Sequence, residues 1–350
     1  MTILEQVPLA DYSTMRLGGS AAYLCEISQR MELLEALDWA RQRSLPVIMI
    51  GSGSNIIWRD EGFSGLLIVN KILKFELFQE DDLNTYLTIG SGEPWDSVVQ
   101  RSVAAGLTGI EALSLIPGTA GATPIQNVGA YGQDISQTLV TVEAFDTVLK
   151  DFVTLAGSDC GFGYRTSRFK THDLGRYFIT GLALHLNSSN PLPPFYPAVT
   201  EYLAAQAITA PTAANIRAAV VAIRTQKLPD PGVVANSGSF FANPIIGGGQ
   251  LAQLQADSGG EIPHWSNEDG SVKLAAAWLI EQAGFKDYHD PETGMGTWPA
   301  QPLVVVNERA THTANLLAFK QKIVSGVQTK FGITLEQEPE LLPLSPTPTT

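Results

Sequence analysis

The chain has 350 residues, of which 44% are hydrophobic and 16% are charged, a composition that excludes a coiled coil or a disordered chain. At about 150 residues per domain, this length predicts two or three domains. The 22 Lys and Arg residues against 35 Asp and Glu residues give a net charge of −13, which disfavours nucleic acid and anionic membranes as partners. A site for an anionic ligand must therefore depend on a local basic cluster.

The N-terminal segment and the cysteines favour a cytoplasmic protein. The first basic residue is Arg16, and the segment before it lacks the apolar core of a secretion signal. No apolar run approaches the ~20 residues of a membrane span. Cys25 and Cys160 form no CxxC motif and are expected to be reduced core thiols. The five histidines show no metal-binding spacing, so no metal site is predicted.

The hydrophobic pattern alternates between strands and helices. Leu33, Leu34 and Leu37 recur at helical spacing, and Ser28 is the expected N-cap of their helix. In chain order, the predicted strands cover residues 23–27, 47–50, 65–70, 86–90, 140–148, 176–187 and 302–307. The predicted helices cover residues 29–45, 95–105, 212–226, 272–283 and 313–331.

The first glycine-rich motif, GSGSN at 51–55, follows a predicted strand. It does not fit a dinucleotide-binding fingerprint, because Ile56 stands where the third glycine belongs and the next segment is a predicted strand. Successive backbone amides in such a turn can bind phosphate without a helix. On this motif alone, an ordinary tight turn is the favoured interpretation.

A second glycine-rich stretch spans 107–135 and has almost no periodicity, which is typical of a functional loop. Its glycines permit close backbone approach, and its hydroxyl and amide side chains offer hydrogen bonds. The residues in question are Gly118, Gly121, Gly129 and Gly132 with Ser114, Thr119, Thr123, Gln126 and Asn127. Two such loops favour a large cofactor with a pyrophosphate, either flavin or another dinucleotide.

Five segments together resemble the family of UDP-N-acetylenolpyruvoylglucosamine reductases, flavoenzymes that complete UDP-N-acetylmuramate for peptidoglycan precursors. The resemblance runs from about residue 12 to 340 and indicates the longer subtype with an extra tyrosine-bearing loop. The segments are GSGSNIIW (51–58), IPGTAGATPIQNVGAYG (116–132), CGFGYRTSRFK (160–170), RTQKLPDPGVVANSGSFFANP (224–244) and GSVKLAAAWLIEQAG (270–284).

This resemblance implies an α+β protein with a flavin-binding fold of the PCMH/vanillyl-alcohol-oxidase type and a C-terminal α+β substrate domain. It implies FAD-binding subdomains at 1–71 and 72–226, a substrate domain at 227–335 and a C-terminal segment at 336–350. It implies FAD and NADPH as cofactors, a UDP-sugar substrate and a monomer. The implied FAD-binding residues are Gly51, Ser52, Gly53, Ser54, Asn55, Pro117, Gly118, Gly121, Ala122, Gln126, Asn127 and Gly129.

The chemistry of reducing an enolpyruvyl ether requires a cation beside the substrate carboxylate and a proton donor. A guanidinium fork suits the developing carboxylate charge, and Arg165 in GYRT matches the arginine of the family. Arg168 lies nearby and could be mistaken for it, and the alternative interpretation of Arg168 is a solvated or ion-paired surface arginine. Ser239 in GSFF matches the serine that donates the proton, and a β-turn serine is the alternative reading.

The third implied catalytic residue is Glu338 in LEQEPEL, a carboxylic acid that would hydrogen-bond the enolate if protonated. Spacing alone does not choose among Glu336, Glu338 and Glu340, because side chains alternate with period two in an extended segment. The segment at 285–301 departs from the family. It is expected to be a variable surface loop rather than a metal cluster.

Substrate diphosphate binding is assigned to residues around a helix end. Arg224 and Lys227 lie three residues apart there, although basic residues also complement the helix dipole. The resemblance favours Lys227 for the phosphate and Asn243 for a substrate contact. Tyr196 is the choice for the mobile tyrosine that covers the diphosphate, with Tyr202 as its rival.

Two other functions stay open. The first is an oxidase of the same flavin-binding fold acting on a sugar or alcohol. Such oxidases often attach flavin covalently through a loop His or Cys, which neither glycine-rich loop contains. The second is a nucleotide-binding protein without catalysis, which the arginine, serine and glutamate candidates disfavour.

Overall fold

A computed structural model describes residues 1–258, 260–267 and 269–344. The chain divides into two compact units, each built from separate stretches of sequence. The divide falls inside the GSGSN turn, between Ser52 and Gly53. Unit 1 comprises residues 1–7, 21–52 and 63–226, and unit 2 comprises 8–20, 53–62 and 227–350. The finer predicted divisions at 71/72 and 335/336 stay predictions.

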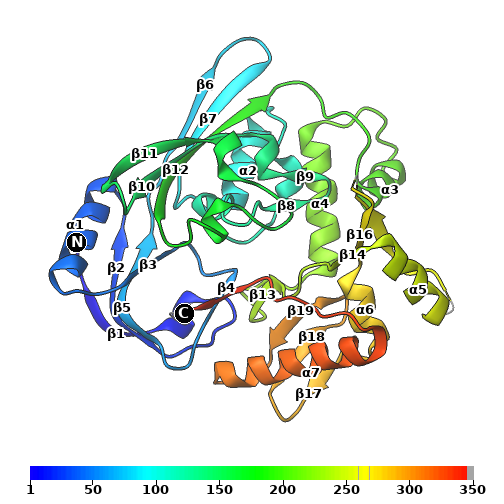
Figure 1. Ribbon diagram of the computed structural model, residues 1–350. Helices are drawn as coiled ribbons and strands as arrows, with labels where there is room; N and C mark the ends of the chain where they lie inside the picture. The colour runs from blue at the N-terminus through cyan, green and yellow to red at the C-terminus, as the bar shows by residue number, and fades with distance from the viewer. Residues whose placement is uncertain (259, 268, 345–350) are drawn as a thin grey trace. The chain divides into compact units, whose positions relative to one another are not determined.

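The first sheet of unit 1 has four strands in the order β1-β2-β5-β3 (Figure 1). Helix α1 packs on this sheet through Leu33, Ala36 and Ala40, which are fully buried. Its N-cap is Gln29, so the prediction of Ser28 as the cap is wrong. The Ser28 N–H instead donates to the Glu32 carboxylate, 2.6 Å away. The elements are β1 (Leu4–Pro8), β2 (Ser20–Ile27), α1 (Arg30–Gln42), β3 (Val47–Ile50) and β5 (Phe63–Asn70).

The second sheet of unit 1 is antiparallel, in the order β11-β10-β12-β7-β6, and the β6–β7 hairpin extends beyond its neighbours (Figure 1). Helix α2 packs against the apolar residues of this sheet through Trp95, Val98 and Val99. The elements are β6 (Phe75–Gln79), β7 (Asn84–Gly90), α2 (Trp95–Ala104), β10 (Leu139–Asp146), β11 (Asp151–Ala156) and β12 (Tyr177–Asn187).

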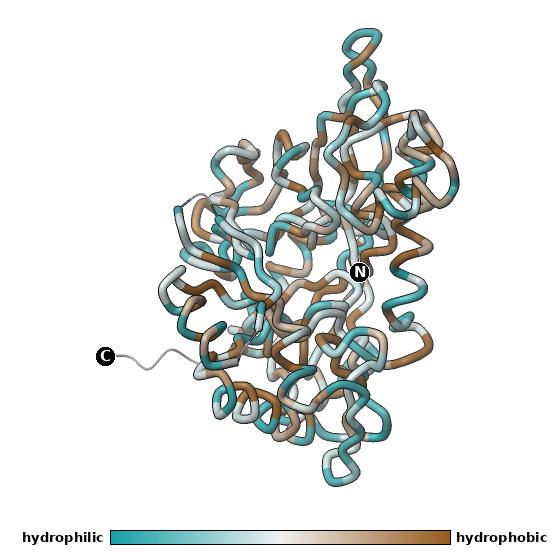
Figure 2. The backbone as a smooth tube through the Cα atoms, turned by 90° about the vertical axis from the view of Figure 1, so that its right-hand side faces the viewer, coloured by the Kyte–Doolittle hydropathy of each residue, from teal (hydrophilic) through white to brown (hydrophobic). Residues whose placement is uncertain are grey.

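Two further helices of unit 1, α3 (Pro197–Ala205) and α4 (Ala213–Lys227), share a separate apolar cluster. Val199 and Leu203 of α3 pack with Ile216, Val220 and Ile223 of α4. The tube representation changes between hydrophobic and hydrophilic within single helices and strands, as elements with one buried face require (Figure 2).

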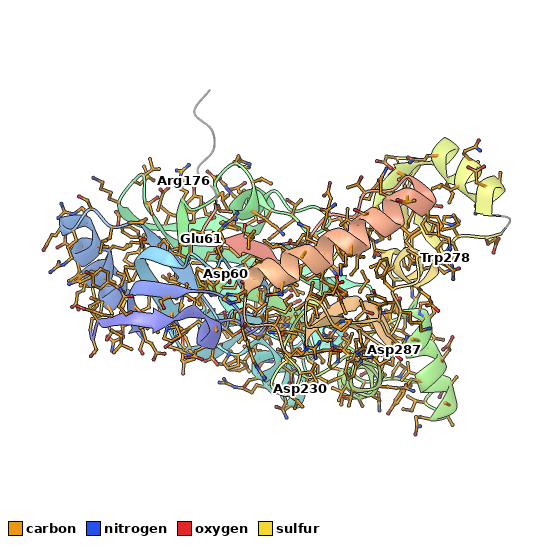
Figure 3. The ribbon with its side chains drawn as sticks, turned by 90° about the horizontal axis from the view of Figure 1, so that it is seen from below. Asp60, Glu61, Arg176, Asp230, Trp278 and Asp287 are labelled. Carbon is orange, nitrogen blue, oxygen red and sulfur yellow. The ribbon has the colours of Figure 1, made fainter. Side chains whose placement is uncertain are left out.

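Unit 2 contains the four-stranded sheet β13-β19-β18-β17, the three-stranded sheet β14-β16-β15 and the parallel pair β4–β20. Helix α7 matches the predicted helix at 313–331, and the Asp60 carboxylate accepts from its first backbone amides at 2.7 and 2.9 Å (Figure 3). The elements are β4 (Ile56–Trp58), β13 (Asn236–Ser239), β14 (Ile245–Gly247), α5 (Gly248–Ser258), β15 (His264–Ser266), β16 (Ser271–Leu274), α6 (Ala276–Gln282), β17 (His289–Asp290), β18 (Met295–Trp298), β19 (Gln301–Asn307), α7 (Thr313–Phe331) and β20 (Glu340–Leu342).

Two predictions for unit 2 are wrong in part. The predicted helix at 272–283 begins only at Ala276, because residues 271–274 pair with β14 and β15 as the strand β16. The segment 285–301 is not wholly a surface loop, because β18 belongs to the four-stranded sheet of unit 2 and its Met295 is fully buried in the core.

Both cysteines are free and buried, and burial raises the pKa of each thiol to about 11. Among the residues that the structure describes, no helix is long and apolar enough to cross a membrane.

Candidate active site

The two glycine-rich motifs meet within unit 1. A Cβ atom placed on Gly51, directly after β3, would lie 2.1 Å from the Thr119 hydroxyl oxygen. A Cβ on Gly121 would lie 2.6 Å from the Cβ of Ser91. Only glycine permits such approach of the backbone. The structure therefore brings Gly51 of the first motif against the second motif, as a shared ligand requires.

Three hydrogen bonds connect the loop that carries Arg165 to the second glycine-rich motif. The Asn127 amide donates to the Gly163 carbonyl at 3.2 Å, and the Arg165 guanidinium donates to the Gly129 carbonyl at 2.8 Å. The Ser167 hydroxyl donates to the Ile125 carbonyl at 2.6 Å. The candidate cation is thus held against the segment predicted to line the flavin.

Arg165 has a left-handed backbone with φ of +55°. It occupies the third position of a turn closed by reciprocal backbone hydrogen bonds between Gly163 and Thr166 at 3.1 and 3.3 Å. Its guanidinium carbon lies 5.3 Å from the centre of the Tyr164 ring. A non-glycine residue in this conformation is strained, and such strain is concentrated at functional sites.

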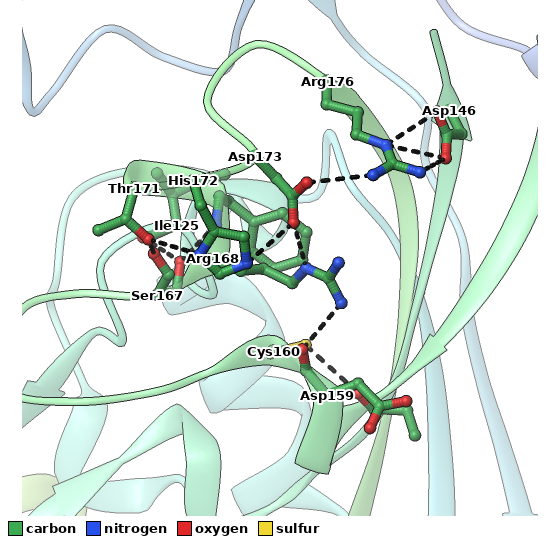
Figure 4. A network of polar contacts seen from close by, with 12 residues as sticks. Ile125, Asp146, Asp159, Cys160, Ser167, Arg168, Thr171, His172, Asp173 and Arg176 are labelled. Carbon is green, nitrogen blue, oxygen red and sulfur yellow. Dashed lines mark hydrogen bonds and ion pairs between the residues drawn. The ribbon is translucent and has the colours of Figure 1, made fainter. Parts of the chain in front are cut away.

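The rival arginine has a different environment. The Arg168 guanidinium pairs with the Asp173 carboxylate at 2.6 Å and donates to the Asp159 carbonyl at 2.9 Å (Figure 4). Asp173 also pairs with Arg176, which makes a forked contact with Asp146. Arg168 therefore belongs to a network of ion pairs, and this supports Arg165 as the substrate cation.

Tyr196 lies in unit 1 at the start of α3 and is 40% exposed. Its ring packs edge-on against Tyr131, with ring centres 5.3 Å apart. Tyr131 also hydrogen-bonds the Arg224 guanidinium, whose Nε is buried and has no hydrogen-bond partner among the described residues. Tyr202 instead packs in the apolar α3–α4 cluster. This environment supports Tyr196 over Tyr202 as the covering tyrosine.

In unit 2, one extended segment joins the glutamate candidates to two other motifs. The Glu338 N–H donates to the Phe240 carbonyl at 2.9 Å, directly after Ser239. The Glu340 N–H donates to the Asn55 carbonyl at 3.0 Å, at the end of GSGSN. Glu338 is half-buried and Glu336 is exposed. Residues 336–340 thus lie beside both the end of β13, which carries Ser239, and the GSGSN motif.

The chain also shows features that fit an FAD pyrophosphate beside the GSGSN turn. Within unit 2, the Thr14 N–H donates to the Gly53 carbonyl at 3.2 Å, and the Thr14 carbonyl accepts from Asn236 at 3.1 Å. The Thr14 hydroxyl oxygen is buried, and no described residue gives it a hydrogen bond. A buried hydroxyl next to this turn fits a polar ligand, since buried polar groups are normally paired.

The two substrate candidates Asn243 and Lys227 have different surroundings. The Asn243 side-chain oxygen accepts from the Ala276 N–H at 2.9 Å, at the start of α6. This bond leaves the Nδ2 group of Asn243 to donate to a ligand. Lys227, the last residue of α4, is exposed.

The acidic cluster at 289–292 is bound to a lysine. Lys322 contacts the Asp290 carboxylate at 2.8 Å and the Glu292 carboxylate at 2.7 Å. Among the residues described, no group of three or more His, Cys, Asp and Glu side chains is placed to hold a metal ion. His289 hydrogen-bonds Glu308, and this carboxylate raises the pKa of the imidazole.

Comparisons with known proteins decide the family. A family described as "FAD binding domain" matches residues 21–151, and "UDP-N-acetylenolpyruvoylglucosamine reductase, C-terminal domain" matches residues 230–342. The UDP-N-acetylenolpyruvoylglucosamine reductase of Ralstonia nicotianae is 38% identical over 98% of this chain and 100% of its own length. That of Thermobifida fusca is 39% identical over 97% of both chains. The chain belongs to the UDP-N-acetylenolpyruvoylglucosamine reductase family.

The fold agrees with this family. The crystal structure of the reductase from Thermus caldophilus matches with a TM-score of 0.67 at 23% identity, over 98% of this chain and 100% of that one. The predictions of an α+β protein, of the flavin-binding fold and of an FAD-dependent oxidoreductase are confirmed.

Sequence reasoning did not single out three residues of unit 1 that contact candidate site residues or the second glycine-rich motif. Tyr131 was only part of a motif, and its contacts with Tyr196 and Arg224 show that it organises that cluster. Asp96 and Arg217 form a forked ion pair beside the second glycine-rich motif. Their separation by 121 residues hides the pair from local pattern analysis, although Arg217 lies seven residues before Arg224 on the same helix.

Proposed function

We propose that this reductase converts UDP-N-acetylglucosamine enolpyruvate to UDP-N-acetylmuramate with electrons from NADPH, and that Arg165, Ser239 and Glu338 are its catalytic residues. The observation that carries the proposal is the segment 336–340, which hydrogen-bonds both Phe240, directly after Ser239, and Asn55 of the GSGSN motif within unit 2. A flavin reductase needs a proton donor and a hydride source at one site, and this segment links the residues proposed for both.

FAD, when bound, supplies the hydride that reaches the terminal carbon of the enolpyruvyl group. Within unit 1, we assign its contacts to Gly51, Ser52, Pro117, Gly118, Gly121, Ala122, Gln126, Asn127 and Gly129. Within unit 2, we assign them to Gly53, Ser54 and Asn55. The close approach of Gly51 to Thr119 and the buried Thr14 hydroxyl support this assignment.

Arg165 has the task of stabilising negative charge on the substrate carboxylate. Charge develops there when the terminal carbon has gained hydride and the neighbouring carbon has not yet gained its proton. A fixed guanidinium stabilises such charge at no further cost of orientation, because its hydrogen bond to the Gly129 carbonyl already holds it.

Ser239 donates the proton to the carbon that bears the carboxylate, and Glu338 in its protonated form hydrogen-bonds the same carboxylate. A serine hydroxyl is a weak acid, so its neighbours must stabilise the charge left on oxygen. Ser239 is half-buried at the end of β13, where its strand pairs with β19 and with the segment that carries Glu338.

We assign the substrate diphosphate to Arg224, Lys227, Asn243 and Tyr196. The buried Arg224 Nε has no partner among the described residues and retains a donor for a ligand. Tyr196 is exposed and rests on Tyr131, so it is placed to move over a ligand with little loss of packing. All these residues belong to one chain, which supports the monomer that the resemblance implies. The two free thiols support a cytoplasmic location.

An anaerobic absorbance experiment tests the reaction. One equivalent of NADPH is added to the FAD-loaded protein, followed by UDP-N-acetylglucosamine enolpyruvate. We expect rapid loss and then rapid return of the oxidised-flavin absorbance, with one UDP-N-acetylmuramate formed per flavin. Reduced flavin that ignores this substrate and reoxidises rapidly in air would indicate an oxidase instead.

Variants separate the catalytic assignments. Because proton donation contributes about 10²–10⁴-fold to a rate, Ser239→Ala is expected to slow flavin reoxidation by substrate by that factor and to leave reduction by NADPH unchanged. Glu338→Ala removes the proposed hydrogen bond and is expected to slow the same step, whereas Glu336→Ala, at an exposed position of the same segment, is not. Equal turnover of Ser239→Ala and the wild type would remove Ser239 from the mechanism.

A further inference from the structure

The backbone is strained at the residue that precedes the proposed flavin-lining segment. Leu115 directly precedes Ile116, Pro117 and Gly118, and its φ of +55° lies in the left-handed region. Leucine adopts this conformation reluctantly, because its Cβ approaches the following carbonyl oxygen. Other contacts must therefore hold Leu115 in place.

Those contacts come from the first turn of α2. The Asp96 carboxylate accepts from the Leu115 N–H at 2.6 Å. The Trp95 indole donates to the Leu113 carbonyl at 3.0 Å, and the Trp95 N–H donates to the Gly118 carbonyl at 3.0 Å. Two adjacent residues of one helix thus contact the segment before, at and after its strained residue.

Asp96 is itself fixed by Arg217 of α4. The two guanidinium NH₂ groups donate to the two Asp96 oxygens at 2.6 and 2.9 Å, which is a forked geometry. Arg217 also donates to the Ser114 hydroxyl at 2.8 Å, and its side chain is only 15% exposed. Burial alone would raise the Asp96 pKa, but the bonds from Arg217 and Leu115 outweigh it and lower the pKa. Asp96 is therefore ionised at neutral pH.

We propose that the Asp96–Arg217 pair is a positioning device for FAD: it holds Leu115 in its left-handed conformation and thereby sets the path of Pro117 and Gly118 along the flavin. The inference rests on the proposed role of Pro117 and Gly118 as flavin-lining residues. Neither member of the pair needs to touch the cofactor. Arg217 fixes the carboxylate, the carboxylate fixes the Leu115 amide, and that amide fixes the loop.

A merely structural ion pair would stabilise unit 1 without influencing FAD binding in particular. Asp146 and Arg176 provide a matched control for this alternative, because they also form a forked pair in unit 1, at 2.7–3.1 Å. Glycine at position 115 separates the two explanations further. Glycine adopts positive φ without strain, so it reduces the need for the Asp96 hydrogen bond.

The test is the dissociation constant of FAD, measured by fluorescence titration of apoprotein prepared from the wild type and from four variants. We expect Asp96→Ala to raise the constant at least tenfold and Asp146→Ala to change it less than threefold. We expect the double variant Asp96→Ala/Leu115→Gly to return to within threefold of Leu115→Gly alone. Circular dichroism at the same temperature establishes that each apoprotein is folded.

The proposal is overturned if Asp96→Ala binds FAD within threefold of the wild type, if Asp146→Ala loses as much affinity, or if glycine at 115 restores nothing. If Asp96→Ala does not fold, Arg217→Lys replaces it, because lysine keeps the charge but lacks the fork. A change below threefold in Arg217→Lys then overturns the proposal. A wild-type apoprotein that takes up no FAD would instead contradict the proposed function itself.

Discussion

The two ends of α4 hold their arginines in opposite ways. Near the start of the helix, Arg217 places both NH₂ groups on the Asp96 carboxylate. Two turns later, on the same face, Arg224 hydrogen-bonds a neutral phenol, Tyr131, and its buried Nε has no partner among the described residues. Burial lowers the pKa of Arg224, whereas the ion pair at the other end lowers the pKa of Asp96.

This difference bears on the proposed binding of a diphosphate by a chain with a net charge of −13. An arginine matched by a carboxylate adds little field at a distance, because the two charges cancel. An arginine matched by a phenol keeps its positive charge for a ligand. The Arg168–Asp173–Arg176–Asp146 network follows the first pattern (Figure 4). Arg224 follows the second.

The largest expected effect is that of replacing Arg217, and it falls on the stability of the fold. Arg217→Met leaves the Asp96 carboxylate without its cation, so the free energy of unfolding should fall by about 2–3 kcal/mol, below the range for fully buried pairs because Asp96 is partly exposed. Urea unfolding of the apoprotein measures this. A fall below about 0.5 kcal/mol would place the pair among exposed ion pairs, which contribute little.

The next effect is on substrate binding and concerns Arg224. Arg224→Met should raise the KM for the UDP-sugar about tenfold, equivalent to about 1.4 kcal/mol, with little change in the reduction of flavin by NADPH. Its free energy of unfolding should not fall, because the variant removes a desolvated charge and leaves no carboxylate unpaired. An unchanged KM together with a stability loss equal to that of Arg217→Met would show that the two arginines have the same role.

How much of this could be predicted from the sequence depends on the distance over which each signal acts. Local periodicity gave α7 at its observed bounds, and the five motifs indicated the family and the flavin-binding fold. The predicted start of α6 was wrong, because the apolar residues Val272 and Leu274 are compatible with either a strand or a helix. Only the pairing of this segment with β14 and β15 determines that it is a strand.

The positioning contacts of the site could not be read from local patterns. The left-handed conformation of Leu115 is invisible in the sequence, because leucine is not a residue that marks positive φ. Asp96, which stabilises this conformation, lies 19 residues before Leu115. Arg217, which holds Asp96, lies 121 residues after Asp96. Such contacts depend on how α2 and α4 pack, which periodicity does not specify.

The last expected effect is a dependence of stability on acidic pH. The bonds from Arg176 lower the pKa of Asp146 to about 2, from an ordinary value of 3.8. Because the folded pKa is the lower one, the ionised carboxylate stabilises the fold above about pH 4, and this contribution is lost as the pH falls toward 2. The difference in melting temperature between the wild type and Asp146→Asn should therefore be largest above pH 4 and should narrow toward pH 2.

The same acid titration distinguishes the two ends of α4. The Asp96 pKa is also lowered, so the gap between the wild type and Asp96→Asn should narrow in the same direction below pH 4. Arg224 hydrogen-bonds a phenol that does not titrate in acid, and the Asp96 carboxylate acts on it only through the electrostatic field, without a hydrogen bond. The gap between the wild type and Arg224→Met should therefore narrow less than that for Asp96→Asn. A gap for Arg224→Met that narrows as steeply would show that Arg224 depends on the Asp96 carboxylate as much as Arg217 does.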